Sequence, residues 1–229
     1  MTLEEFSLEF DILYNNITSN QAPGLSELEK SIFLTQAQEA IVKQYYKGDL
    51  EQSFENTEEV TEYLNTLVSQ KKYIEKDKID NDSSILLSSK HYSSTFKLPD
   101  DVMFITYESA SVYTKISGSL IPSATKAVLV VPTTQDEFFN IHKNPFRGPS
   151  KNRAVRLIAG DKIEVISANP IKEYLVRYIR LPKPIVLQGA GEIKPYNEHT
   201  NGLNTELPES VHRNILMQAV ALAKASWAS

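Results

Sequence analysis

The chain has 229 residues, of which 41% are hydrophobic and 23% charged, and its formal net charge is −5. This is the composition of an ordinary globular protein that can bury a core, as one large domain or two small ones. The acidic balance disfavours a protein that grips DNA, because neutralising phosphates requires clustered lysine and arginine. The absence of cysteine excludes disulfides, thiolate nucleophiles and zinc sites with cysteine ligands.

Three amphipathic helices are predicted in the first third of the chain. Thr2 and Glu5 have capping-box spacing at the start of the first helix, and Ser26 and Glu29 have it at the start of the second. A third helix is predicted over residues 57–68. The acidic start of the chain is not a signal peptide pattern, and no apolar run approaches the ~20 residues needed to cross a bilayer. We therefore expect no membrane partner.

The hydrophobic period changes after the charged stretch from Lys71 to Asp82, which we interpret as a solvated connector. Alternating, β-branched and aromatic runs then predict strands, with a hairpin turn at Gly160-Asp161. Thr134 is placed to cap a short helix, and Pro208 to begin the last one. The predicted strands cover residues 94–98, 102–113, 127–131, 154–159, 163–166 and 174–181.

Grouped rather than alternating elements predict an α+β fold. We expect an N-terminal helical hairpin or bundle, an antiparallel β-rich middle and a C-terminal helix. The expected domains are a helical region at 1–84, a β-rich region at 85–206, and a C-terminal helix at 207–229 that packs back on the helical region.

Catalytic and ligand-binding motifs are missing from the sequence. The four histidines are scattered, with no HExxH pattern, and neither a G-x-S-x-G elbow nor a phosphate-binding glycine loop occurs. We therefore expect a protein that is not an enzyme and that needs no cofactor or metal.

Five arginines fall within 34 positions, whereas the first third of the chain is rich in glutamate. They indicate either a nucleic-acid contact or a subunit interface, where arginine is enriched and pairs well with carboxylates. The separation of acidic and basic regions favours the interface. The five are Arg147, Arg153, Arg156, Arg177 and Arg180.

The loop from Asn144 to Pro149 contains two prolines, which predict a defined shape at low entropic cost. Phe146 at its tip is expected to pack either on the chain's own core or on a neighbouring chain, and we favour the neighbour. The candidate interface therefore comprises Asn144, Pro145, Phe146, Arg147, Arg153, Arg156, Arg177 and Arg180.

Four segments stand out together, SIFLTQAQEAIVK at 31–43, NPFRGP at 144–149, EYLVRY at 173–178 and the closing stretch 207–227. They resemble structural proteins of crAss-like phages of gut bacteria. These segments occur in the same order and span nearly the whole chain. The order of helices, strands and a last helix is also similar to the tail-tube adaptor family of short-tailed phages.

This resemblance implies a structural virion protein that forms a ring in the phage neck, between portal and tail. The ring is expected to be a dodecamer, assembled in the cytoplasm of the bacterial host. Its implied partners are further copies of itself, the portal protein, other neck or tail rings, and genomic DNA that passes through the lumen without specific binding during packaging retention and ejection. The alternative is a small non-catalytic DNA-binding or regulatory module that uses the cluster from Arg147 to Arg180.

Overall fold

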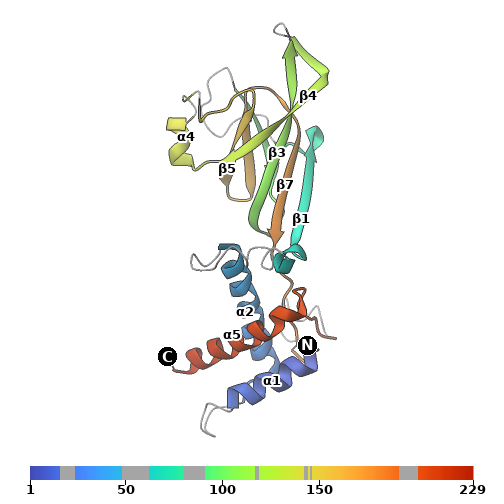
Figure 1. Cartoon of the computed structure of the whole chain (residues 1–229), viewed down its shortest axis with the longest axis vertical. Helices are drawn as coiled ribbons and strands as arrows, with labels where there is room; N and C mark the ends of the chain where they lie inside the picture. The colour runs from blue at the N-terminus through green and yellow to red at the C-terminus, as the bar shows by residue number, and fades with distance from the viewer. Residues whose placement is uncertain are drawn as a thin grey trace. The chain divides into compact units, whose positions relative to one another are not determined.

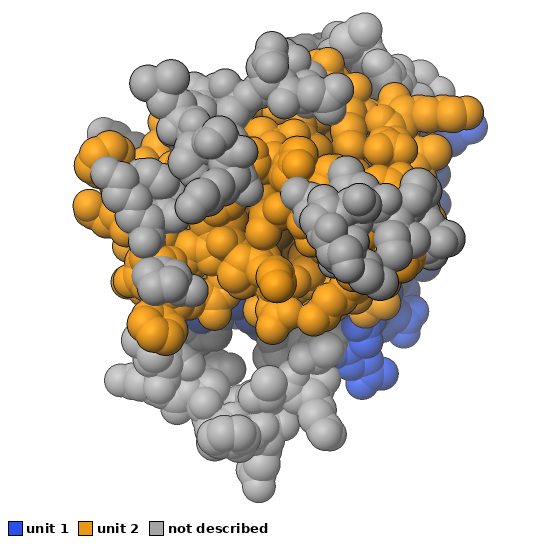
Figure 2. Space-filling model, turned by 90° about the horizontal axis from the view of Figure 1, so that it is seen from above, with its two compact units in different colours: residues 1–67, 181–229 blue, residues 68–180 orange. Residues whose placement is uncertain are grey.

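The computed structural model has the predicted α+β fold, with helices first, a curled β-sheet in the middle and a helix at the end (Figure 1). The chain forms two compact units, one of residues 1–67 with 181–229 and one of residues 68–180 (Figure 2). The sequence placed its boundaries at 84/85 and 206/207 instead. The structure describes residues 1–15, 24–47, 62–79, 91–116, 119–141, 144, 146–190 and 201–228, with backbone only at 115–116, 119–123 and 227–228.

The helices of the first unit are α1 (Leu3–Asn15), α2 (Glu27–Lys47) and α5 (Glu209–Ala228). Both predicted capping boxes are confirmed. The Thr2 amide donates to Glu5 Oε2 at 2.8 Å, and the Glu5 amide donates to Thr2 Oγ1 at 3.2 Å. The same reciprocal bonds join Ser26 and Glu29 at 2.7 and 3.3 Å. Because these bonds join residues three apart, they fix where each helix begins.

One face of α1 supplies the core of this unit. Phe6, Phe10 and Tyr14 recur every four residues and are buried. Helix α5 packs against both α1 and α2, and its His212 ring lies 5.5 Å from the ring of Phe6. The imidazole of His212 also makes a 3.0 Å hydrogen bond with the carbonyl oxygen of Leu207. Burial lowers the pKa of His212, so the neutral ring is the favoured form in the core.

A polar stripe on α2 binds the extended segment 183–187. The amides of Leu187 and Ile185 donate to Ser31 Oγ and Thr35 Oγ1 at 2.9 and 3.1 Å. One turn further along α2, Gln38 Nε2 donates to the carbonyl oxygen of residue 183 at 2.8 Å. The segment therefore has its backbone polar groups paired by side chains, as burial demands.

Gly202 has a conformation and surroundings that only glycine fits. Its φ of +83° lies in the left-handed region, which side chains rarely adopt. A Cβ atom there would lie 2.5 Å from Leu3 Cδ1 and 3.0 Å from the carbonyl oxygen of Val186. The neighbouring Leu203 exchanges two backbone hydrogen bonds of 2.8 Å with Val186, so the turn at Gly202 brings residue 203 back alongside the buried segment.

The second unit is built on a seven-stranded sheet of order β1-β7-β3-β4-β5-β6-β2. All neighbours are antiparallel except β4 and β5, which run parallel over four residue pairs. The predicted hairpin turn at Gly160-Asp161 is confirmed, since Ala159 pairs with Lys162. The strands are β1 (Val68–Ile74), β2 (Tyr92–Lys97), β3 (Val102–Ile116), β4 (Ser119–Pro132), β5 (Arg153–Ala159), β6 (Lys162–Ser167) and β7 (Ile171–Arg180).

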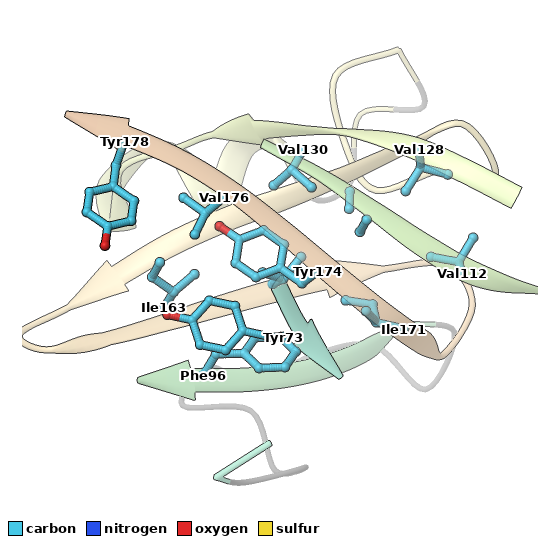
Figure 3. Packing of buried hydrophobic residues seen from close by; sticks show 13 residues of the cluster. Tyr73, Phe96, Val112, Val128, Val130, Ile163, Ile171, Tyr174, Val176 and Tyr178 are labelled. Atoms are coloured by element: carbon cyan, nitrogen blue, oxygen red, sulfur yellow. The ribbon is translucent and has the colours of Figure 1, made fainter. Parts of the chain in front are cut away.

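The sheet curls until its two edge strands meet. Tyr73 of β1 and Phe96 of β2 lie with ring centroids 5.2 Å apart, and both stack on Tyr174 of β7 at 5.8 and 5.4 Å (Figure 3). The Tyr73 hydroxyl donates to the carbonyl oxygen of Lys97 at 2.5 Å. Burial raises the pKa of Tyr73 to about 12, so the hydroxyl remains a donor at neutral pH. The aromatic stack therefore closes the concave face of the sheet.

Strand β1 corrects the prediction that Lys71 to Asp82 forms a solvated connector. Val68–Ile74 pairs along its whole length with β7, and a one-turn 3-10 helix, η1 (Glu75–Asp77), follows it. Tyr73 is the one buried residue of the strand, and most of the other side chains of β1 are exposed to solvent. The helix predicted over 57–68 lies outside the described residues up to 61, is helical at 62–65, and has become strand by Val68.

A short helix, α4 (Gln135–Ile141), covers part of the opposite face of the sheet. The predicted cap is confirmed, since Thr134 Oγ1 accepts a 3.3 Å hydrogen bond from the amide of Glu137. Its Phe138 is buried in a cluster with Val155, Leu157 and Ile166. This packing positions α4 directly before the proline-containing loop.

Candidate subunit interface

The loop after α4 has a tight, defined shape. Asn144 Oδ1 accepts hydrogen bonds from the amides of Phe146 and Arg147 at 2.8 and 3.3 Å. The carbonyl oxygen of Asn144 accepts a further bond from the amide of Gly148 at 2.7 Å. An asparagine side chain that bonds its own following backbone is a common way to hold such a turn. Pro145, one of the two prolines expected to stiffen the loop, lies outside the described residues.

Arg153 ties this loop to the start of β5. Its Nη1 donates to the carbonyl oxygen of Phe146. The turn between them is closed by a 2.9 Å bond from the Ser150 amide to the Arg153 carbonyl oxygen. Lys126 of β4 donates to Asn152 Oδ1 at 2.6 Å, which anchors the turn to the sheet. The loop is therefore fixed to regular structure at both of its ends.

The side chain at the tip points into solvent. Phe146 is 84% exposed, and Phe139 on the outer face of α4 is 67% exposed. The option that Phe146 packs on the chain's own core is wrong, whereas contact with a neighbouring chain stays a prediction. Arg147 beside it is exposed, and its guanidinium has no hydrogen-bond or ion-pair partner among the described residues. A rigid loop thus presents one large apolar side chain and one cation.

Two further arginines lie on β7. Arg177 is exposed on the convex face, where its Nε donates to Gln70 Oε1 at 2.8 Å and its guanidinium lies 5.9 Å from the ring centre of Tyr107. Arg180 is half-buried at the end of the strand, and its charge acts to lower the pKa of Tyr178, although burial outweighs it and leaves that pKa raised.

Arg156 points to the concave side of the sheet, because neighbouring residues along a strand face opposite sides. Its Nε lies 3.1 Å from Glu108 Oε2, but its N–H is not aimed at that oxygen in hydrogen-bond geometry. The side chains are 11% and 4% exposed, respectively. Glu108 Oε1 accepts a hydrogen bond from the hydroxyl of Tyr174. Arg156 therefore pairs with a carboxylate of its own chain, which weakens the prediction that it lies at a subunit seam.

Glu108 and Tyr174, which form a concave cluster with Arg156, both have raised pKa values. Burial raises the pKa of Glu108, and the Tyr174 hydrogen bond and the Arg156 charge oppose this without cancelling it. Burial also raises the pKa of Tyr174, with the charge and hydrogen bond of Glu108 adding to the effect. The sequence analysis missed this cluster, although Glu108 shares a period-two face with Ala110 and Val112, both of which are buried in the core.

The five arginines therefore do not form one basic patch. The structure places Arg147 and Arg153 at the loop, Arg156 in the concave core and the other two on β7. Within the described residues, no group of three or more histidine and carboxylate side chains is arranged to hold a metal ion. No helix in that part of the chain is both long enough and apolar enough to span a bilayer.

A model of the phage tail ring protein 3/4 family matches residues 1–229, the full length of the chain. The chain belongs to this family. It is 39% identical over 227 residues to Ring protein 3 of Bacteroides phage crAss001, an alignment that covers 97% of this chain and 95% of the relative. It is 33% identical over 245 residues to Ring protein 4/5 of the same phage, which covers 99% and 94%.

Membership of this ring-protein family confirms the resemblance stated from the sequence. The protein is a structural ring protein of a crAss-like phage and thus a virion component. A ring made of identical subunits needs two different surfaces on each copy, which meet head to tail.

Proposed function

We propose that the protein forms a homo-oligomeric ring, a dodecamer, in the neck of the virion between portal and tail. The ring assembles in the host cytoplasm, contacts the portal protein and other rings, and serves as a conduit for DNA during packaging retention and ejection. The loop carries this proposal, because it holds Phe146 84% exposed beside Arg147, whose guanidinium has no partner among the described residues.

The loop is suited to bind a neighbouring copy. Burying a phenylalanine contributes about 1.5–3 kcal/mol, and the same contact recurs at every seam of a closed ring. The hydrogen bond that Asn144 accepts and the one that Arg153 donates hold the loop in shape before binding, so little conformational entropy is lost. Arg147, Arg153, Arg177 and Arg180 remain our candidate interface cations, together with Asn144 and Pro145 of the loop.

The charge of the chain supports a conduit that does not hold DNA. Each copy carries −5, so a dodecamer carries roughly −60, twelve times that charge. Opposite charges at the seams offset part of this repulsion. The lumen is proposed to be neutral or acidic on balance, so that phosphates slide past without meeting a row of cations.

Electron microscopy and light scattering of the purified full-length chain test the ring, and cryo-EM of purified virions tests its position. We expect rings, and density for this protein between portal and tail. Phe146→Ala is expected to weaken assembly while leaving the circular dichroism spectrum unchanged. Met217→Ala, which removes another exposed apolar side chain, is the matched control.

A chain that stays monomeric and shifts DNA in a salt-sensitive way would instead support the DNA-binding module. A virion with this protein elsewhere than the neck would refute the position but not the ring.

A further inference from the structure

Helix α1 has a second apolar stripe that the fold does not cover. Leu8 and Ile12 are 63% and 49% exposed, and they lie four residues apart on one face of the helix. Around them on the exposed side of the helix lie three carboxylates, Glu4, Glu5 and Glu9.

This face is strongly anionic as well as apolar. No lysine or arginine among the described residues forms a salt bridge with Glu4, Glu5 or Glu9. The nearby cation, Lys30, is already bound to Asp11 and to a carboxylate of α2 at 2.6 and 3.0 Å. An apolar pair bordered by negative charge repels phosphate and fits a partner with an apolar side chain next to a cation.

We propose that this α1 face is the acceptor for the loop of a second copy, with Phe146 seated on Leu8 and Ile12 and Arg147 paired with Glu9. The inference rests on the proposed ring and names the two surfaces of its seam. The loop carries an exposed aromatic ring and a guanidinium that has no partner in the part of the chain that the structure describes, and the α1 face has neither.

Self-association of α1 is the competing arrangement, and charge disfavours it. Two α1 faces meeting about a two-fold axis would bring like carboxylates together, and a two-fold contact closes a dimer rather than a ring. Contact between α1 of one copy and the loop of the next is heterologous, so it repeats around a ring and makes one apolar and one ionic contact at each seam.

The absence of cysteine allows a direct test with the full chain, because introduced thiols are the only ones present. Glu4→Cys copies mixed with Lys151→Cys copies keep Leu8 and Phe146 in place, because both substituted positions are exposed beside the two surfaces, and they are expected to give a covalent dimer under a short bismaleimide. A chain that carries both substitutions is expected to give a ladder of covalent oligomers ending at the subunit number. The control pairs Lys151→Cys with Met217→Cys, which is exposed on α5.

Charge reversal is the second test of the proposed contact. Glu9→Arg alone and Arg147→Glu alone are each expected to raise the concentration at which rings form by about tenfold or more. Both changes in one chain restore a complementary pair at every seam and are expected to recover assembly. Glu62→Arg combined with Arg147→Glu is the matched control and is not expected to recover it.

The outcomes separate the two proposals. A wild-type chain that forms no ring alone or in virions overturns the proposed function, and this inference with it. Rings that form without the cross-link from residue 4 to residue 151, or without recovery in the charge swap, overturn the inference alone.

Discussion

The ion pair on the concave side of the sheet allows a double-mutant cycle in which one buried hydrogen bond is kept constant. Glu108→Gln removes the negative charge but keeps an acceptor for the Tyr174 hydroxyl. Arg156→Met removes the positive charge and keeps an unbranched side chain of similar length. We expect each single change to cost far more than the two together, because each leaves one buried charge without its counter-ion.

The expected magnitude follows from the distance and burial of the pair. The charged groups of Glu108 and Arg156 lie 3.1 Å apart, with 4% and 11% side-chain exposure. Two unit charges about 4 Å apart interact by about 4 kcal/mol at an effective dielectric constant near 20. Breaking a buried pair on one side costs about 3–5 kcal/mol, and replacing both partners is often close to neutral. The two single costs minus the near-neutral double cost give an upper bound of about 6–10 kcal/mol for the coupling free energy, and the Coulomb interaction gives about 4 kcal/mol, so we expect a coupling of at least about 4 kcal/mol.

Urea unfolding followed by circular dichroism at neutral pH measures the cycle. Glu173→Gln with Lys72→Met is the control, because that pair lies 3.0 Å apart on the same sheet but is much more exposed. Its coupling is expected to stay below about 1 kcal/mol. Equal coupling in both cycles, or additive costs at Glu108 and Arg156, would refute the argument from burial.

The pH dependence of the Arg156→Met variant gives an internal check on the cycle. Because the folded-state pKa of Glu108 is raised, its contribution to stability is present below the unfolded pKa and is lost as pH rises through the folded value. Removing the guanidinium removes an influence that lowers this pKa. The variant is therefore expected to lose more stability than the wild type as the pH rises from acidic to neutral.

Three further predictions concern the helical unit. Gly202→Ala is expected to lower the free energy of unfolding by about 1–3 kcal/mol, because of the positive φ and the close contacts together. Gly24→Ala, which has open space around it, is expected to change the free energy of unfolding little. Chemical denaturation measures both. Ser26→Ala is expected to cost about 1 kcal/mol through loss of the α2 cap, by the same assay. His212 has a lowered pKa, so its contribution is present above the unfolded pKa and is lost as pH falls through the folded value; His212→Gln is expected to flatten that part of a curve of melting temperature against pH.

Local chemistry explains which elements could be predicted from sequence. The capping boxes join residues three apart, and the hairpin at Gly160-Asp161 needs only a two-residue turn. Both features therefore depend on residues that are close together in the sequence. Strand β1 is different. It exists because it pairs with β7, about a hundred positions away, and its side chains other than Tyr73 carry little apolar signal. A charged edge strand and a solvated connector are therefore hard to distinguish in one sequence.

The candidate interface shows the same division. The turn at the loop could be predicted from its asparagine, glycine and proline residues, whereas the sequence left open whether Phe146 packs on the chain's own core. The clustering of the arginines in sequence was misleading, because the two sides of a strand alternate and only the fold decides which side is buried. Arg153 thus serves the loop, and Arg156, three positions on, enters the concave core.

The segment that docks on α2 shows how prolines can fix an alignment. Residues 183, 185 and 187 use their amides to bond side chains, and the residue before each of the first two is a proline, which has no amide to offer. If the segment were shifted by one residue along α2, Pro184 would lie opposite Thr35 and could not donate a hydrogen bond to its hydroxyl oxygen. Proline at position 183, 185 or 187 is therefore expected to lower the free energy of unfolding, and so is Val186→Pro, because the Val186 amide donates to the carbonyl oxygen of Leu203. Because proline has no amide to donate, Pro182 and Pro184 disfavour any alignment of this segment on α2 that is shifted by one residue.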